Sequence, residues 1–75
     1  MTPAELKSIR QNLGLSAEGL ARLVGVEAGR TVRRWEAGDR DIPGPVRVLL
    51  TAIMASAAVR RHFGIEIKEP VDHPQ

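Results

Sequence analysis

The sequence predicts an all-α fold, a compact bundle of four or five short helices, with one domain over residues 1–64 and a tail over residues 65–75. Apolar residues recur three and four positions apart, which is the spacing of one face of an α-helix. Helix-capping residues precede these segments and glycines follow them. With 75 residues and no cysteine, the chain can form one small core without disulfides.

The first predicted helix follows Thr2. Thr2 can cap it, Pro3 suits its first position, and Glu5 completes a capping box. Gly14 is a suitable left-handed stop. The apolar face between these ends consists of Leu6, Ile9 and Leu13.

A second helix is predicted from Ser16, its N-cap, to Gly25. Glu18 places a negative charge in the first turn, where the helix dipole favours it. Val26 follows in a turn and is expected to be buried. The apolar stripe consists of Leu20, Leu23 and Val24, with the small Ala21 beside it.

The third predicted helix starts near Ala28, ends at Ala37 and has two chemically different faces. At about 100° per residue, Ala28, Val32 and Trp35 share one stripe, so the indole of Trp35 is expected in the core. Arginine has paired N–H donors that match the acceptors of guanine in the major groove, and also phosphate. The face opposite the apolar stripe carries Arg30, Arg33 and Arg34.

A long apolar segment, Val46–Val59, predicts a fourth helix that begins after Gly44 and Pro45. Eleven of its fourteen residues are apolar, but a bilayer span needs about 20, so the segment is interpreted as a core or interface helix. One stripe is expected to enter the core: Val46, Leu49, Leu50, Ile53 and Ala57.

The second apolar stripe of this helix predicts contact with a partner, because a small domain cannot bury two faces of one helix easily. We expect a homodimer. The alternative is that the C-terminal segment covers this stripe. The predicted dimer interface consists of Val48, Ala52, Ala55, Val59 and Phe63.

The C-terminal segment has a different pattern. Residues 65–69 alternate apolar and charged side chains, as a short strand would, and residues 70–75 are typical of a flexible tail. Net charge also changes along the chain. Residues 1–65 hold ten Lys and Arg against six Asp and Glu, whereas residues 66–75 carry a net charge of −2. The basic part is compatible with a polyanionic partner.

Catalytic and metal-binding patterns are not found in the sequence. It contains no Gly-rich phosphate loop, nucleophile motif or cluster of metal ligands, and His62 and His73 have no other ligand type near them. We therefore expect no enzyme activity, cofactor, metal site or membrane association. The N-terminus lacks the pattern of a signal peptide, so a cytoplasmic protein is expected.

Two motifs together resemble the Cro/repressor-like (Xre) family of bacterial and phage regulators. They read Leu15-Ser16-x-Glu18-x-Leu20-Ala21-x-Leu23-x-Gly25-Val26 and Thr31-Val32-x-x-Trp35-Glu36-x-Gly38, and the match covers about residues 5–53. The resemblance implies a lambda-repressor-like bundle containing a helix-turn-helix. In that motif the second helix enters the major groove, and dimers bind two half-sites of double-stranded DNA.

The resemblance also implies roles for individual residues. Base contacts fall on Arg30, Thr31, Arg33 and Arg34, phosphate contacts fall on Ser16 and Arg40, and an ion pair joins Arg10 to Glu36. Two departures stand out. Residue 17 is Ala where the family often has a phosphate-binding Gln, and the turn before Trp35 is one residue longer than usual, which affects the register of Gly29 and Arg30.

These observations predict a sequence-specific DNA-binding transcriptional regulator, a repressor that excludes polymerase by occupying an operator as a homodimer. It would work in the cytoplasm, at the nucleoid. Two alternatives remain open. One is an antitoxin-type interaction module that masks a toxin partner, which the acidic C-terminal segment allows. The other is a DNA-binding part of a phage packaging or excision assembly.

Overall fold

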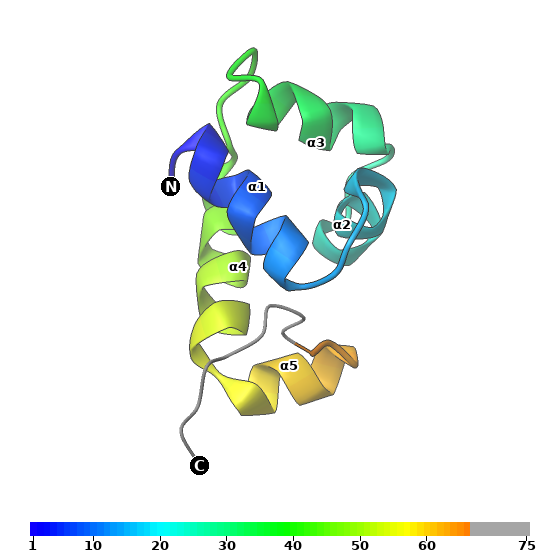
Figure 1. Ribbon diagram of the computed structural model, residues 1–75, viewed down its shortest axis with the longest axis vertical. Helices are drawn as coiled ribbons and strands as arrows, with labels where there is room; N and C mark the ends of the chain where they lie inside the picture. Colours follow the sequence, from blue (N-terminus) through cyan, green and yellow to red (C-terminus); the bar gives the residue numbers. More distant parts are fainter. Residues whose placement is uncertain (67–75) are drawn as a thin grey trace.

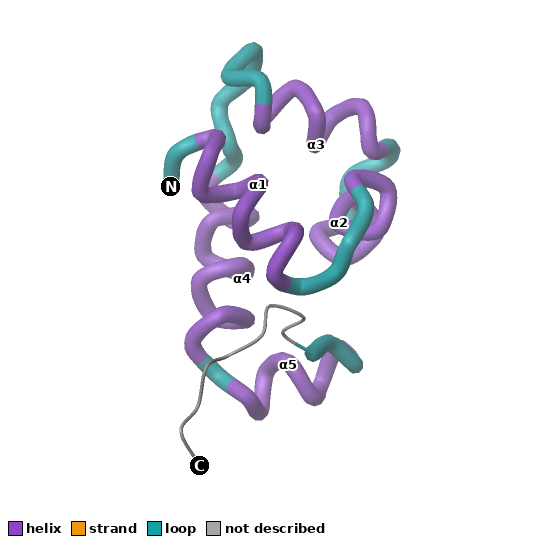
Figure 2. Tube along the Cα trace, in the orientation of Figure 1, coloured by secondary structure: helices purple, strands orange, loops and turns teal. Residues whose placement is uncertain are grey.

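The computed structural model describes residues 1–66, and this part of the chain contains five helices and no strand (Figures 1 and 2). The prediction of an all-α bundle of four or five helices is confirmed. Ile65 and Glu66 are not in a strand, and the remaining residues of the predicted strand and tail lie outside the described residues. The helices are α1 (Pro3–Asn12), α2 (Ala17–Val24), α3 (Gly29–Glu36), α4 (Gly44–Ala55) and α5 (Ala57–Phe63).

The predicted capping residues begin the first two helices. The Thr2 hydroxyl accepts a hydrogen bond from the Glu5 backbone N–H at 3.1 Å, and the Glu5 carboxylate accepts one from the Thr2 N–H at 2.6 Å. The bond that the carboxylate accepts from the Thr2 N–H also lowers the pKa of the Glu5 carboxyl. Ser16 caps α2 by accepting from the Gly19 N–H at 2.9 Å. Each cap satisfies a backbone donor that has no partner within its helix.

The long apolar segment forms two helices, so the prediction of one helix over residues 46–59 is wrong. Ser56 adopts an extended conformation (φ −131°, ψ 117°), which ends α4, and its hydroxyl accepts from the Val59 N–H to cap α5. Arg60 then donates two hydrogen bonds, both 2.9 Å, to the carbonyls of Ile53 and Met54. The chain therefore bends at Ser56, and the bend is stabilised on both sides.

A single apolar core joins α1, α2, α3 and α4. Leu15, Val26 and Val59 are half-buried around it, so Val26 is less buried than expected. No polar or charged residue among residues 1–66 is buried. The core consists of Leu6, Leu13, Ala17, Leu20, Ala21, Val32, Trp35, Val46, Leu50 and Ile53.

The arrangement leaves α3 at one end of the molecule. In Figure 1, α4 runs along the left side, α3 lies across the top and α5 crosses the lower end. The loop after α3 leads down into α4, and α2 lies beside the start of α3. One long side of α3 is therefore free of other helices.

Candidate nucleic-acid interface

Helices α2 and α3 form a tight helix-turn-helix unit. Gly25 ends α2 with φ +83°, a left-handed conformation that glycine adopts without a steric penalty. The N–H groups of Gly25 and Val26 both donate to the carbonyl of Ala21, at 3.0 and 2.9 Å. The chain then turns through Ala28, whose extended backbone precedes α3. The two bonds to the Ala21 carbonyl fix the direction in which the chain leaves α2.

Gly29 allows α3 to pass very close to the start of α2. Gly29 is buried, and a β-carbon added to it would lie 2.9 Å from the backbone nitrogen of Glu18 and 2.6 Å from a carboxylate oxygen of the same residue. No β-carbon fits at that distance without movement of the backbone. A glycine at this position therefore lets the first turn of α3 rest against the first turn of α2.

Helix α3 is apolar on one side and cationic on the other. Val32 is fully buried and Trp35 is 3% exposed, so both hold the helix to the core as predicted. Thr31 is half-buried at the edge of this contact. The opposite side carries three exposed arginines: Arg30, Arg33 and Arg34. A rigid helix thus presents a set of guanidinium groups to solvent.

Glu18 holds one of these arginines. Nη2 of Arg33 donates to Oε2 of Glu18 at 2.8 Å, and both side chains are more than half exposed. The hydrogen bond from Arg33 is the main cause of a lowered pKa for the Glu18 carboxyl, which keeps it ionised. Arg30 and Arg34 have no hydrogen bond or ion pair to another side chain within residues 1–66. The three arginines therefore differ in how firmly they are oriented.

An ion pair between Arg10 and Glu36 fixes the far end of α3 to α1. Nε and Nη2 of Arg10 donate to the two carboxylate oxygens of Glu36, at 2.6 and 3.0 Å. Nη1 of Arg10 also donates to the carbonyl of Leu15 at 3.0 Å. The side chains are 17% and 10% exposed, and the carboxylate raises the pKa of Arg10. The structure thus joins these two residues in an ion pair with two hydrogen bonds.

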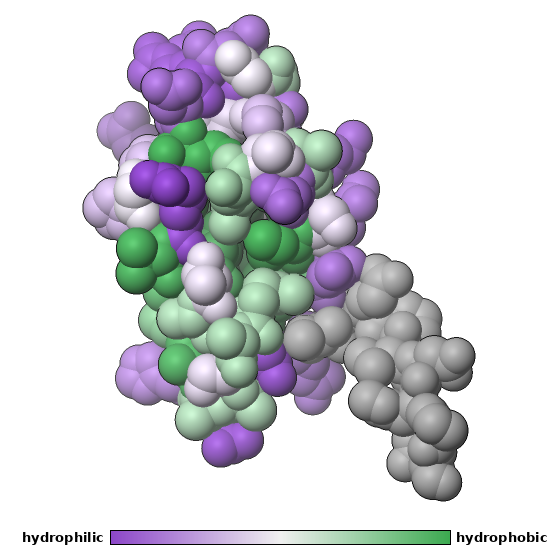
Figure 3. Space-filling view, turned by 90° about the vertical axis from the view of Figure 1, so that its left-hand side faces the viewer, coloured by the Kyte–Doolittle hydropathy of each residue, from purple (hydrophilic) through white to green (hydrophobic). Residues whose placement is uncertain are grey.

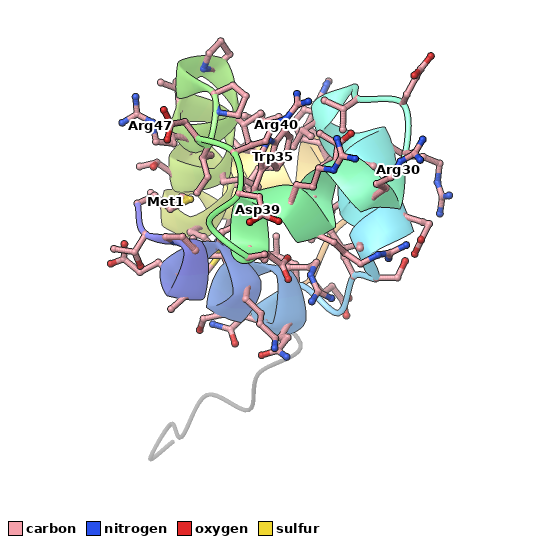
Figure 4. The ribbon with its side chains drawn as sticks, turned by 90° about the horizontal axis from the view of Figure 1, so that it is seen from above. Met1, Arg30, Trp35, Asp39, Arg40 and Arg47 are labelled. Atoms are coloured by element: carbon pink, nitrogen blue, oxygen red, sulfur yellow. The ribbon has the colours of Figure 1, made fainter. Side chains whose placement is uncertain are left out.

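A second basic group lies where α3 is followed by α4. Arg40 is in the loop, Arg47 is in the first turns of α4, and both line a surface hollow to which Asp41 also contributes. The backbone N–H groups of Asp39 and Arg40 donate to the carbonyl of Arg34, which folds the loop back onto α3. Figure 4 looks down onto this end of the molecule and shows Arg40 between Arg30 and Arg47.

The start of α2 differs from the family pattern at residue 17. Ala17 is buried in the core, so the site where the family often has a glutamine makes a packing contact instead. Ser16 is exposed, and its oxygen accepts the capping bond while its hydroxyl hydrogen stays free to donate. A phosphate at this end of α2 can therefore be met by the Ser16 hydroxyl but not by residue 17.

A helix-turn-helix family model matches residues 6–50, a segment that contains all of α2 and α3 and most of α1 and α4. The chain belongs to this family. The match supports the resemblance to Cro/repressor-like regulators and identifies a DNA-binding regulatory domain. No curated protein and no solved structure matches the chain.

The five residues predicted for the dimer interface of this helix-turn-helix protein do not form one stripe. Val48 is 71% exposed, Ala55 is exposed and Ala52 is half-buried, and these three share a hollow on α4. Val59 is half-buried against the core, and Phe63 is 41% exposed with its ring edge against His62. The bend at Ser56 separates the two groups, because α5 runs across the end of α4.

Three features of the site were not expected from the sequence: the Glu18–Arg33 ion pair, the contact at Gly29, and the pairing of Arg47 with Arg40 in one hollow. Glu18 and Arg33 are fifteen residues apart, and the angle between α2 and α3 brings them together. For the third feature the sequence did offer a signal, namely Arg47 itself, a cation that interrupts the apolar segment.

Within residues 1–66 there is no group of metal ligands, and no helix is long and apolar enough to cross a membrane.

Proposed function

We propose that this helix-turn-helix protein is a transcriptional repressor that binds an operator as a homodimer. The observation that carries the proposal is the division of α3 into a buried side, with Val32 and Trp35, and an exposed side with three arginines. A helix fixed in this way can enter the major groove as a rigid unit. Occupation of the operator would exclude polymerase, and the protein would act at the nucleoid in the cytoplasm.

The contacts divide into two kinds. Arg30, Arg33 and Arg34 are proposed to read bases, since they are exposed on the side of α3 opposite the core, and the half-buried Thr31 is proposed to join them. Ser16 and Arg40 are proposed to bind phosphates on either side of the groove, where they set the orientation of α3. Arg47 joins Arg40 in this role, because both line the same hollow.

The homodimer is proposed to form through the exposed apolar side of α4. Val48 is the most exposed large apolar residue of the described chain, and Ala52 and Ala55 lie next to it. Figure 3 shows this side of the molecule, with hydrophobic residues gathered over its middle and lower parts and hydrophilic ones at the upper end. The basic end stays clear of the apolar surface, so two copies could pair through α4 and leave both α3 helices free for adjacent half-sites.

Fluorescence anisotropy tests the proposal. Labelled duplexes from the region upstream of the gene, and scrambled duplexes of the same composition, are titrated with the protein over a series of salt concentrations. We expect tight, sequence-selective binding that weakens steeply as salt rises, with a slope that reports the number of phosphates neutralised. Binding that is equal on both duplexes would contradict the proposal.

Matched variants separate base reading from overall charge. Arg30→Ala, which removes an exposed arginine from α3, is expected to lower the preference for the operator. Arg61→Ala removes an exposed arginine of α5, at the other end of the molecule, and serves as the control with the same change in net charge. Equal losses for the two variants would mean that α3 contributes only charge.

The toxin-masking alternative rests on residues 65–75, of which only Ile65 and Glu66 are among the described residues. No contact in the described part of the chain favours it over the DNA-binding proposal. It would become the better explanation if the anisotropy experiment showed weak, unselective binding and a second small protein co-purified in a fixed ratio.

A further inference from the structure

Glu18 is a carboxylate in a place where DNA-binding proteins normally favour cations. It lies in the first turn of α2, beside the proposed phosphate contact at Ser16 and next to the first turn of α3. It lines one surface hollow together with Arg22, Arg30 and Arg33. A negative charge here opposes the approach of a phosphate backbone, so its presence needs another explanation.

The hydrogen bond from Arg33 to Glu18 explains why a carboxylate is present at this position. Glu18 engages Nη2 of Arg33 at 2.8 Å, and the guanidinium keeps four of its five N–H bonds. A fork of two parallel N–H bonds therefore remains for the O6 and N7 acceptors of a guanine. An arginine side chain on a helix surface otherwise samples many rotamers, and the bond to the Glu18 carboxylate reduces that freedom before DNA arrives.

We infer that Glu18 is a specificity-determining positioning residue, which orients Arg33 to read one guanine of the operator. The inference rests on the proposed function, since it assigns a role within the same DNA-reading surface. Glu18 acts through Arg33 and touches no base itself. Its charge weakens binding to DNA in general, and its orientation of Arg33 raises the preference for one base pair.

The two effects have opposite signs, which makes the inference testable. Glu18→Ala should strengthen binding to scrambled DNA while it lowers discrimination at one base pair by roughly tenfold, within the range for a bidentate arginine contact. Glu18→Gln keeps an acceptor oxygen without the charge, so it should also bind scrambled DNA more tightly but retain discrimination. Glu27→Ala is the control, since Glu27 lines the same hollow and has no bond to Arg33.

The measurement is anisotropy on a panel of duplexes in which each base pair of the selected operator is replaced in turn. Wild-type protein, the three single variants, Arg33→Ala and the double variant Glu18→Ala/Arg33→Ala are compared, after thermal melts show that each is folded. We expect the base pair that loses discrimination in Glu18→Ala to be the one lost in Arg33→Ala, and the double variant to show no further loss there.

Failure of the inference can be told from failure of the proposed function. If wild-type protein binds every duplex equally, the proposed function is wrong. If wild-type protein discriminates and Glu18→Ala keeps the same profile, the inference is overturned and Glu18 only reduces affinity. A loss in Glu18→Ala that is independent of Arg33, or an equal loss in Glu27→Ala, would overturn it as well.

Discussion

The three arginines of α3 are alike in sequence but not in surroundings. Arg33 is bonded to Glu18, whereas the guanidinium groups of Arg30 and Arg34 have no such partner within residues 1–66. An unpartnered arginine loses more rotamer freedom when it binds a base than one that is already held. We therefore expect Arg30 and Arg34 to contribute mainly through the contact itself, and Arg33 through contact and orientation together.

Arg34→Ala tests the proposed register of α3. The change leaves the backbone carbonyl that accepts from Asp39 and Arg40, so the loop should keep its conformation. We expect a loss of about 1–3 kcal/mol in operator binding, with relaxed preference at one base position. Anisotropy on the operator panel measures both. Unchanged binding would show that Arg34 does not face the groove.

The Glu18–Arg33 ion pair predicts a pH effect of known sign. Because the bond stabilises the ionised carboxylate, the pKa of Glu18 is lowered in the folded protein, and the bond is lost as pH falls through that pKa. Carboxyl carbon NMR during an acid titration should show Glu18 titrating below the usual glutamate range. In Arg33→Ala its midpoint should move upward. A midpoint that does not move would mean that the two groups are not paired in solution.

At the scale of the residue, sequence patterns predicted which side of a helix a residue lies on better than which side chains form a pair. The burial of Val32 and Trp35 and the exposure of Arg30, Arg33 and Arg34 follow from helical periodicity alone. The bond between Glu18 and Arg33 depends on the crossing of α2 and α3, which no local pattern encodes. The Arg10–Glu36 pair was reached only through family resemblance, for the same reason.

The packing of α3 against α2 requires a glycine at position 29. Gly29→Ala would place a β-carbon 2.9 Å from the backbone nitrogen of Glu18, so one helix must shift. We expect a loss of about 1–3 kcal/mol in unfolding free energy, even though alanine is the better helix former. Thermal or urea denaturation followed by circular dichroism measures it.

Gly44→Ala is the matched control for that substitution. Gly44 also begins a helix, and the nearest atom to an added β-carbon is 3.6 Å away, an ordinary contact. We expect little change or a small gain in stability. If both variants lost the same stability, loss of glycine in general, and not the contact with α2, would be the cause.

The ion pair between Arg10 of α1 and Glu36 of α3 predicts a large loss of stability when one partner is removed. Arg10→Met leaves the Glu36 carboxylate, 10% exposed, and the Leu15 carbonyl without their donors. We expect a loss of about 2–4 kcal/mol in unfolding free energy by denaturant titration. The double variant Arg10→Met/Glu36→Leu should recover part of it. No recovery would mean that the packing of the arginine stem matters more than the pair.

At the scale of the helix, the sequence predicted where α1 and α2 begin but not where α4 ends. Thr2 and Ser16 were identified as caps, and both accept the expected bonds. The break at Ser56 was missed, because serine within an apolar helical segment breaks no periodicity. Whether its hydroxyl caps a new helix depends on tertiary contacts, here the bonds from Arg60 to the end of α4.

The proposed homodimer is a property of the whole molecule. Val48→Glu puts a charge on the exposed apolar side of α4 without touching the core, since Val48 is 71% exposed. Sedimentation equilibrium should show a monomer with an unchanged melting temperature. Affinity for DNA with two half-sites should fall roughly 10²-fold or more, while affinity for one half-site stays the same. Gln11→Glu, on an exposed position of α1, is the control. A dimeric Val48→Glu protein would place the interface elsewhere.

The separation of core-packing and exposed residues on α3 has a practical consequence for engineering this protein. Val32 and Trp35 make the core contacts of the helix, and Gly29 makes its close approach to α2, so positions 30, 33 and 34 are structurally unconstrained apart from the bond to Glu18. A library randomised at those three positions should consist largely of folded proteins. Selecting such a library against chosen DNA targets would yield variants with new sequence preferences on an unchanged scaffold, and randomising position 18 along with them would widen the range of bases that can be reached.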